Sequence, residues 1–98
     1  MRTNAEILAS PTSELSGDEW FARSCLRLAL AAFRCPACGA PTTHMQACGV
    51  SDVNEWPTPP KQMERRAFCP ECATELVFST RIAATGFLTR AHADAQAA

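Results

Sequence analysis

Four cysteines form two short, similar units that could together bind one metal ion. The sequences Cys-Pro-Ala-Cys at 35–38 and Cys-Pro-Glu-Cys at 69–72 each hold two thiols, and 30 residues separate the units. A tight turn in each unit would present both thiolates, with backbone N–H groups sharing their negative charge. Two such turns facing each other make a tetrahedral sulfur site, which suits Zn²⁺ and leaves no open position for catalysis. We therefore expect a structural zinc site with four ligands: Cys35, Cys38, Cys69 and Cys72.

A metal would compensate for a small hydrophobic core. The chain has 98 residues, and only 22 of them are Val, Ile, Leu, Met, Phe or Trp. Chains this short bury a modest fraction of their surface and commonly need a metal, disulfides or a partner. Structural zinc contributes about 10–16 kcal/mol of apparent binding free energy in zinc-finger peptides, so it would stabilise such a fold strongly.

The two cysteine units and their flanks resemble the zinc-ribbon family. Phe33-Arg34 precedes the first unit and Arg65-Arg66-Ala67-Phe68 the second. The resemblance covers residues 33–80 and implies that each unit lies at the tip of a β-hairpin. Within that family, the Arg-Arg pair and the expected strand at 76–80 are similar to Ogr/Delta-type phage activators and to zinc ribbons of bacterial transcription repressors. That resemblance implies a role in transcription regulation.

Other metal assignments remain open. The spacing also resembles rubredoxin, in which the same four-sulfur site would hold iron for electron transfer. Alternatively, His44 and Cys48 could join the first cysteine pair in a zinc-knuckle arrangement, leaving Cys25 and His92 to the second pair. Otherwise we expect Cys25 to be a buried apolar side chain. Cys48 is then an unliganded loop thiol, His44 a solvated hairpin residue and His92 part of a tail.

Residues 16–34 carry the strongest helix signal. Ser16 with Glu19 three residues later forms a capping-box pattern, and Arg34 would complement the negative helix end. Arg23 and Arg27 are spaced to share a solvent-facing side. The apolar side chains extend beyond one face, so we expect part of this helix to bind a protein partner or a second copy. The expected contact residues are Trp20, Phe21, Leu26, Leu30 and Phe33.

The remaining segments complete a small α+β fold: an N-terminal helix followed by a zinc ribbon of short β-hairpins. Residues 1–15 form an arm in which Asn4 could cap a short helix ending near Ser10-Pro11. Three prolines between 57 and 60 interrupt the 35–80 ribbon with a long loop, and residues 74–80 alternate as a strand does. The Ala-rich segment 81–98 is expected to be a loose tail with helical propensity.

Two functions from different classes fit these features. In the favoured one, a protein-binding accessory or adaptor subunit presents the 17–33 helix to its partner. In the alternative, a nucleic-acid-binding regulator contacts phosphates through Lys61, Arg65, Arg66 and Arg81. Nine basic residues against ten acidic ones give a net charge of −1, which favours the first function.

The sequence offers few features of other protein classes. It has no paired carboxylates, glycine-rich phosphate loop or HExxH stretch, so we expect neither an enzyme nor a small-molecule substrate. No run of 18 apolar residues appears, and Glu6 interrupts the start where a secretory signal would be apolar. We expect a cytoplasmic protein without a membrane segment, in which reduced cysteines serve as metal ligands.

Overall fold

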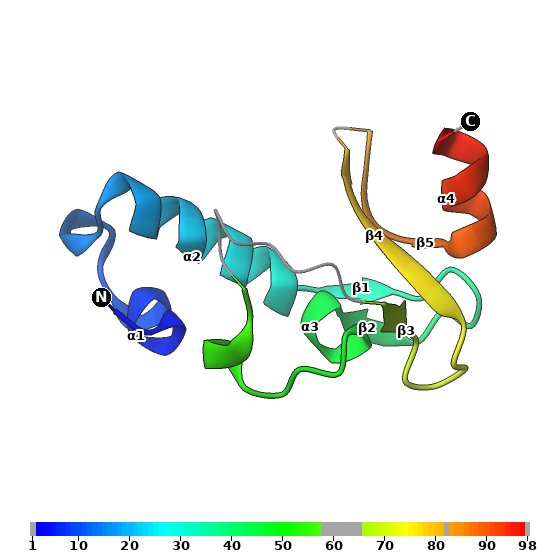
Figure 1. Cartoon of the computed structure of the whole chain (residues 1–98), viewed down its shortest axis with the longest axis horizontal. Helices are drawn as coiled ribbons and strands as arrows, with labels where there is room; N and C mark the ends of the chain where they lie inside the picture. Colours follow the sequence, from blue (N-terminus) through cyan, green and yellow to red (C-terminus); the bar gives the residue numbers. More distant parts are fainter. Residues whose placement is uncertain (1, 58–65, 82, 98) are drawn as a thin grey trace.

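The computed structural model describes residues 2–57, 66–81 and 83–97, which form a mixed α+β fold. Strands β1 and β2 make one antiparallel pair, and β3, β4 and β5 make a three-stranded antiparallel sheet in that order. Figure 1 shows α1 and α2 at one end of the molecule, and the β4–β5 hairpin with α4 at the other. The helices are α1 (Asn4–Ala9), α2 (Gly17–Leu30), α3 (His44–Ala47) and α4 (Arg90–Ala97), with 3₁₀ turns η1 (Thr12–Glu14) and η2 (Val53–Glu55). The strands are β1 (Ala32–Arg34), β2 (Pro41–Thr43), β3 (Ala67–Phe68), β4 (Glu75–Arg81) and β5 (Ala84–Thr89).

Helix α2 begins where the sequence predicts and ends earlier. The Ser16 side chain accepts a hydrogen bond from the Glu19 backbone N–H, and the Glu19 carboxylate accepts one from the Ser16 N–H, so the predicted capping box is confirmed. The predicted end at Arg34 is wrong, because the helix stops at Leu30. Residues 32–34 instead pair with 41–43 in the hairpin that carries the first cysteine unit.

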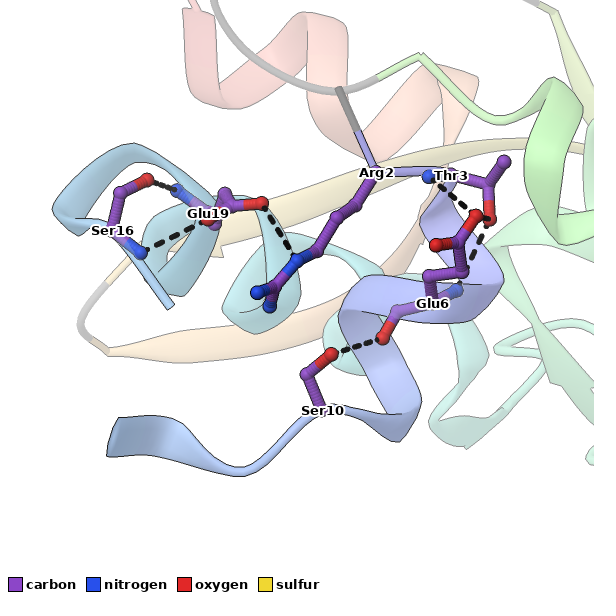
Figure 2. A network of polar contacts seen from close by, with 6 residues as sticks. All are labelled: Arg2, Thr3, Glu6, Ser10, Ser16 and Glu19. Carbon is purple, nitrogen blue, oxygen red and sulfur yellow. Dashed lines mark hydrogen bonds and ion pairs between the residues drawn. The ribbon is translucent and has the colours of Figure 1, made fainter. Parts of the chain in front are cut away.

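A second capping box starts α1, and it uses Thr3 instead of the expected Asn4. Thr3 and Glu6 exchange the same pair of hydrogen bonds as Ser16 and Glu19. Figure 2 shows the Arg2 guanidinium reaching from one box to the other, with its Nε 3.7 Å from a Glu19 carboxylate oxygen. The Asn4 amide donates to the carbonyls of Val53 and Trp56, both at 2.8 Å, and so ties α1 to η2.

The chain's own N-terminal arm covers one side of α2. Ala22, Leu26 and Ala29 repeat with helical spacing and are buried, and Leu26 is 0% exposed against Ile7 and its neighbours. Arg23 is only 5% exposed, so its predicted position on the solvent side is wrong. Its guanidinium donates to the Ser10 carbonyl at 3.1 Å and to the Thr12 hydroxyl at 2.6 Å, which compensates for its burial.

An aromatic cluster joins the two sheets. The His44 ring stacks on Phe78 with centroids 4.4 Å apart and meets Trp56 edge-on at 4.9 Å. The predicted solvated position of His44 is therefore wrong, and burial lowers the pKa of its imidazole. Phe33 and Phe87 complete the cluster around Phe78, at 5.5 and 5.4 Å.

The segment expected to be a tail supplies a strand. The predicted strand at 74–80 is confirmed as β4, and β5 pairs with it along its length, with Phe78 opposite Phe87. The boundary that we predicted at residue 80 thus falls inside a hairpin. Strand β5 passes close to β1 at Gly86, where a Cβ would lie 3.5 Å from the Phe33 ring. Helical propensity near the C-terminus is confirmed by α4.

Candidate metal centre

Each cysteine unit occupies the turn at the tip of an antiparallel hairpin. In the first turn, between β1 and β2, the Cys35 N–H donates to the Ala40 carbonyl at 2.9 Å, and the Gly39 N–H to the Cys35 carbonyl at 2.8 Å. The Ala37 N–H lies 3.4 Å from the Cys35 sulfur, which is the N–H to thiolate contact expected from the sequence.

The second turn, between β3 and β4, repeats this hydrogen bonding. The Cys69 N–H donates to the Thr74 carbonyl at 3.0 Å, and the Ala73 N–H to the Cys69 carbonyl at 2.8 Å. Thr74 and Ala73 therefore correspond to Ala40 and Gly39 of the first turn. We did not predict a role for these four residues from the sequence, although each pair lies four and five residues after the first cysteine of its unit.

The four sulfur atoms meet where the two turns face each other. Cys35 and Cys72 lie 3.8 Å apart, Cys38 and Cys69 lie 3.6 Å apart, and all four sulfurs are within 4.8 Å of one another. A tetrahedral ion with metal–sulfur bonds of about 2.3 Å has sulfur–sulfur edges of about 3.8 Å. The four cysteines thus suit a single tetrahedral metal ion, and their thiolate donors suit zinc.

The cysteines of each turn differ in exposure. Cys35 and Cys69 are buried in the core with Leu76 and Phe87, whereas Cys38 and Cys72 are exposed. The first cysteine of each unit therefore belongs to the hydrophobic core, and the second faces solvent.

Local hydrogen bonds also shift the pKa values of the two exposed thiols, Cys38 and Cys72, in opposite directions. The Thr74 hydroxyl, followed by the Thr74 backbone N–H, lowers the pKa of Cys72 to about 6. The Ala40 backbone N–H acts to lower the pKa of Cys38, but desolvation and hydrogen bonds with the other three sulfurs raise it to about 12. Because a metal must displace thiol protons to bind, its apparent affinity falls as the pH is lowered.

The other candidate ligands lie apart from this centre. Among the described residues, the group able to hold a metal consists of the four predicted cysteines alone, and His44 packs in the aromatic cluster. The zinc-knuckle alternative is therefore wrong. Cys25 is partly buried on α2, where desolvation raises the pKa of its thiol, and His92 is exposed on α4. Cys48 is partly buried and packs beside both the metal-site core and the Ala29, Met45 and Val50 cluster.

The structure separates the five predicted partner-binding residues into two groups. Trp20 and Phe21 are 51% and 52% exposed, and Leu30 is 43% exposed at the other end of α2. Leu26 was wrongly placed in this set, because the α1 layer buries it completely. Phe33 was also misplaced, because it lies in β1 and packs in the aromatic cluster.

The predicted phosphate contacts are described only in part. Lys61 and Arg65 lie outside the described residues. Arg66 donates through Nε to a Glu75 carboxylate oxygen at 2.8 Å and lies over the exposed Phe68 ring at 5.5 Å. Glu75 also accepts from Arg90 at 3.0 Å, and these arginines lower the pKa of its carboxyl.

The three-stranded sheet also carries Arg81, which is the last predicted phosphate contact, and the aromatic residues Phe68 and Phe78. Arg81 is exposed at the end of β4. Phe68 is exposed, whereas Phe78 packs against the core that contains Cys35 and Cys69.

Comparisons with protein-family models, curated proteins and solved structures gave no match. Of the helices in the described part of the chain, none has both the length and the apolar composition needed to cross a bilayer.

Proposed function

We propose that this chain is a zinc-ribbon protein whose metal has a structural role and whose α2 helix binds a protein partner in the cytoplasm. The zinc assignment is supported by the sulfur–sulfur distances, which match a tetrahedral ion with four protein ligands. Four ligands leave no open coordination position for a substrate or water, so we propose no catalytic activity.

The observation that carries the binding role is the exposure of Trp20 and Phe21. These large side chains are adjacent on α2, and the fold leaves each about half exposed while it buries Leu26 from the same helix. Tryptophan is among the residues that contribute most binding energy in protein interfaces, where a partner's pocket covers the side chain. At the far end of α2, Leu30 borders an open groove of about 570 Å³ that Met45, Val50 and Pro70 also line.

Nucleic-acid binding receives less support. A phosphate contact requires a cation that can leave its protein partner, and Glu75 already engages both Arg66 and Arg90. The net charge of −1 further weakens attraction to a polyanion.

Metal analysis tests the zinc assignment. Elemental analysis of reduced protein should give one zinc per chain, and Cys35→Ser or Cys72→Ser should lower the zinc content and near-UV dichroism together. Red protein containing iron would instead support the rubredoxin-like alternative. Less than one metal ion per chain, with an unchanged melting transition in excess chelator, would overturn the structural metal site.

Variants of α2 test the partner-binding role. Affinity purification from the native host should recover a stoichiometric partner, and Trp20→Ser with Phe21→Ser should abolish its recovery while zinc content stays at one. Arg27→Ser is the matched control, because it changes another exposed residue on the same helix. Sedimentation of the purified chain distinguishes a second copy from a different partner. Unchanged recovery with the double variant, or DNA binding that weakens steeply with added salt, would contradict this role.

A further inference from the structure

Two of the four cysteines in the proposed zinc centre are exposed to solvent, and the other two are buried. Cys38 and Cys72 are exposed, whereas Cys35 and Cys69 are buried in the core. Oxidation of cysteine requires a thiolate that the oxidant can reach, and bound zinc would hold all four sulfurs as thiolates. Exposure therefore limits the first attack to Cys38 or Cys72.

One hydroxyl group distinguishes these two sulfurs. Ala40 and Thr74 occupy equivalent positions in the two turns, since each accepts a hydrogen bond from the backbone N–H of the first cysteine of its unit. As a thiol, Cys72 donates a hydrogen bond to the Thr74 Oγ1 at 3.2 Å, but a zinc-bound Cys72 thiolate has no proton, so the hydroxyl would donate to it instead. The equivalent residue of the first turn, Ala40, has no hydroxyl. A hydroxyl that donates to a thiolate withdraws electron density from it, so Cys38 is the stronger nucleophile of the pair.

The partner for a disulfide is already adjacent. The Cys69 sulfur lies 3.6 Å from that of Cys38, across the interface between the two turns. We propose that Cys38 is an oxidation site, at which a peroxide converts the zinc centre into a Cys38–Cys69 disulfide and releases the metal. This inference rests on the proposed zinc function and adds a redox response to it.

The chemistry balances with hydrogen peroxide as the oxidant. The Cys38 thiolate attacks one peroxide oxygen, the O–O bond breaks, and the departing hydroxide takes up a proton to form water. The Cys69 thiolate then attacks the resulting sulfenic acid, an S–S bond forms, the S–O bond breaks, and a second water leaves after protonation. Two thiolates have been oxidised and one peroxide reduced, and zinc leaves because only two thiolate ligands remain.

The experiment treats the zinc-loaded full chain with hydrogen peroxide. A colorimetric indicator follows zinc release, and non-reducing peptide mass spectrometry identifies the first disulfide. We expect a Cys38–Cys69 disulfide to form in step with zinc release. Thr74→Val should raise oxidation at Cys72 by about two- to tenfold, the range that one hydrogen bond represents, and produce a Cys35–Cys72 disulfide. The matched variant Ala40→Thr should slow zinc release by a similar factor.

The outcomes separate this inference from the zinc assignment. Less than one zinc per chain before peroxide is added would overturn both. A full zinc content followed by a first disulfide at Cys35–Cys72, or one that includes Cys25 or Cys48, would overturn the oxidation site alone. Unchanged oxidation rates in both the Thr74 and Ala40 variants would also overturn it.

Discussion

Ala73 adopts the left-handed backbone conformation that usually belongs to glycine. Its φ is +61°, and the equivalent residue of the first cysteine turn is Gly39, with a φ of +76°. The left-handed region costs a residue with a Cβ about 1–2 kcal/mol, whereas glycine loses about 0.5–1 kcal/mol through its greater freedom in the unfolded chain. The second turn therefore contains strain that the first turn avoids.

Exchanging these two residue types should change stability in opposite directions. We expect Ala73→Gly to raise the free energy of unfolding by about 0.5–1 kcal/mol and Gly39→Ala to lower it by about 1 kcal/mol. A Cβ at position 39 would meet no other atom within 4 Å, so the stability lost in Gly39→Ala comes from the backbone conformation alone. Urea unfolding in excess zinc measures both effects. Ala84→Gly in β5 is the control and should destabilise, and an equal loss with Ala73→Gly would contradict the prediction.

The burial of His44 predicts a loss of stability in acid. Its folded-state pKa lies below the unfolded value of about 6.5, so the unfolded chain binds the proton more readily. The contribution of the neutral ring is complete above about pH 6.5 and is lost as the pH falls towards the folded pKa. His44→Phe keeps an aromatic ring against Phe78 but does not titrate. Stability measured from pH 7.5 to 5.5 in excess zinc should therefore fall less steeply in this variant.

Any loss of bound metal in acid would affect the wild type and the His44 variant alike, so the difference between their slopes isolates the imidazole. His92→Phe is the control, because His92 is exposed on α4. Parallel curves for wild type and His44→Phe would contradict the prediction.

Helix α2 depends on its first residue as well as on its buried face. Ser16→Ala removes the hydroxyl that caps the helix and should lower the free energy of unfolding by about 1 kcal/mol. Ser24→Ala, the same substitution at an exposed position on this helix, removes only a hydrogen bond to the Trp20 carbonyl and should be neutral or slightly stabilising. Urea unfolding followed by far-UV dichroism compares the two. Equal changes in the free energy of unfolding for the two variants would show that the capping box does not stabilise the protein.

The elements that sequence reasoning missed form through contacts distant along the chain. The start of α2 could be predicted because Ser16 and Glu19 lie within one turn of each other. Strand β5 contains Gly86 and lies within the Ala-rich segment 81–98, and it forms because Phe87 packs against Phe78 and against Phe33, which lies more than fifty residues earlier. Local propensity contains no information about such contacts.

At the scale of the whole molecule, Trp56 links the helical end to the metal end. It packs against the α1–α2 core that contains Leu26, against the Met45 cluster, and edge-on to His44. A metal ion bound by the four cysteines would hold the two hairpins together at one side of the aromatic cluster, so its removal should loosen that cluster and the surroundings of Trp56.

Chelation tests this link directly. In a Trp20→Phe variant, Trp56 is the remaining tryptophan, and its emission reports on the junction. Excess chelator should shift that emission to longer wavelength and abolish near-UV dichroism, while far-UV dichroism retains part of the α2 signal. Returning zinc should reverse each change. Emission that stays unchanged while the metal is removed would contradict the coupling between the two ends.

The sequence alone predicted the two cysteine turns and the four candidate metal ligands, because each pair has the two-residue spacing of a turn that presents both thiols. Only the tertiary structure brings the two pairs, 30 residues apart in the chain, within 4.8 Å of one another. The sequence also determined where α2 starts. Tertiary structure decided which apolar side chains of α2 remain exposed, because α1 packs over Leu26 and buries it but leaves Trp20 and Phe21 half-exposed. It likewise decided that Arg23 is buried, that His44 is half-buried in the aromatic cluster and that β5 joins the sheet. These outcomes depend on which distant segments pack together, and no local pattern specifies that.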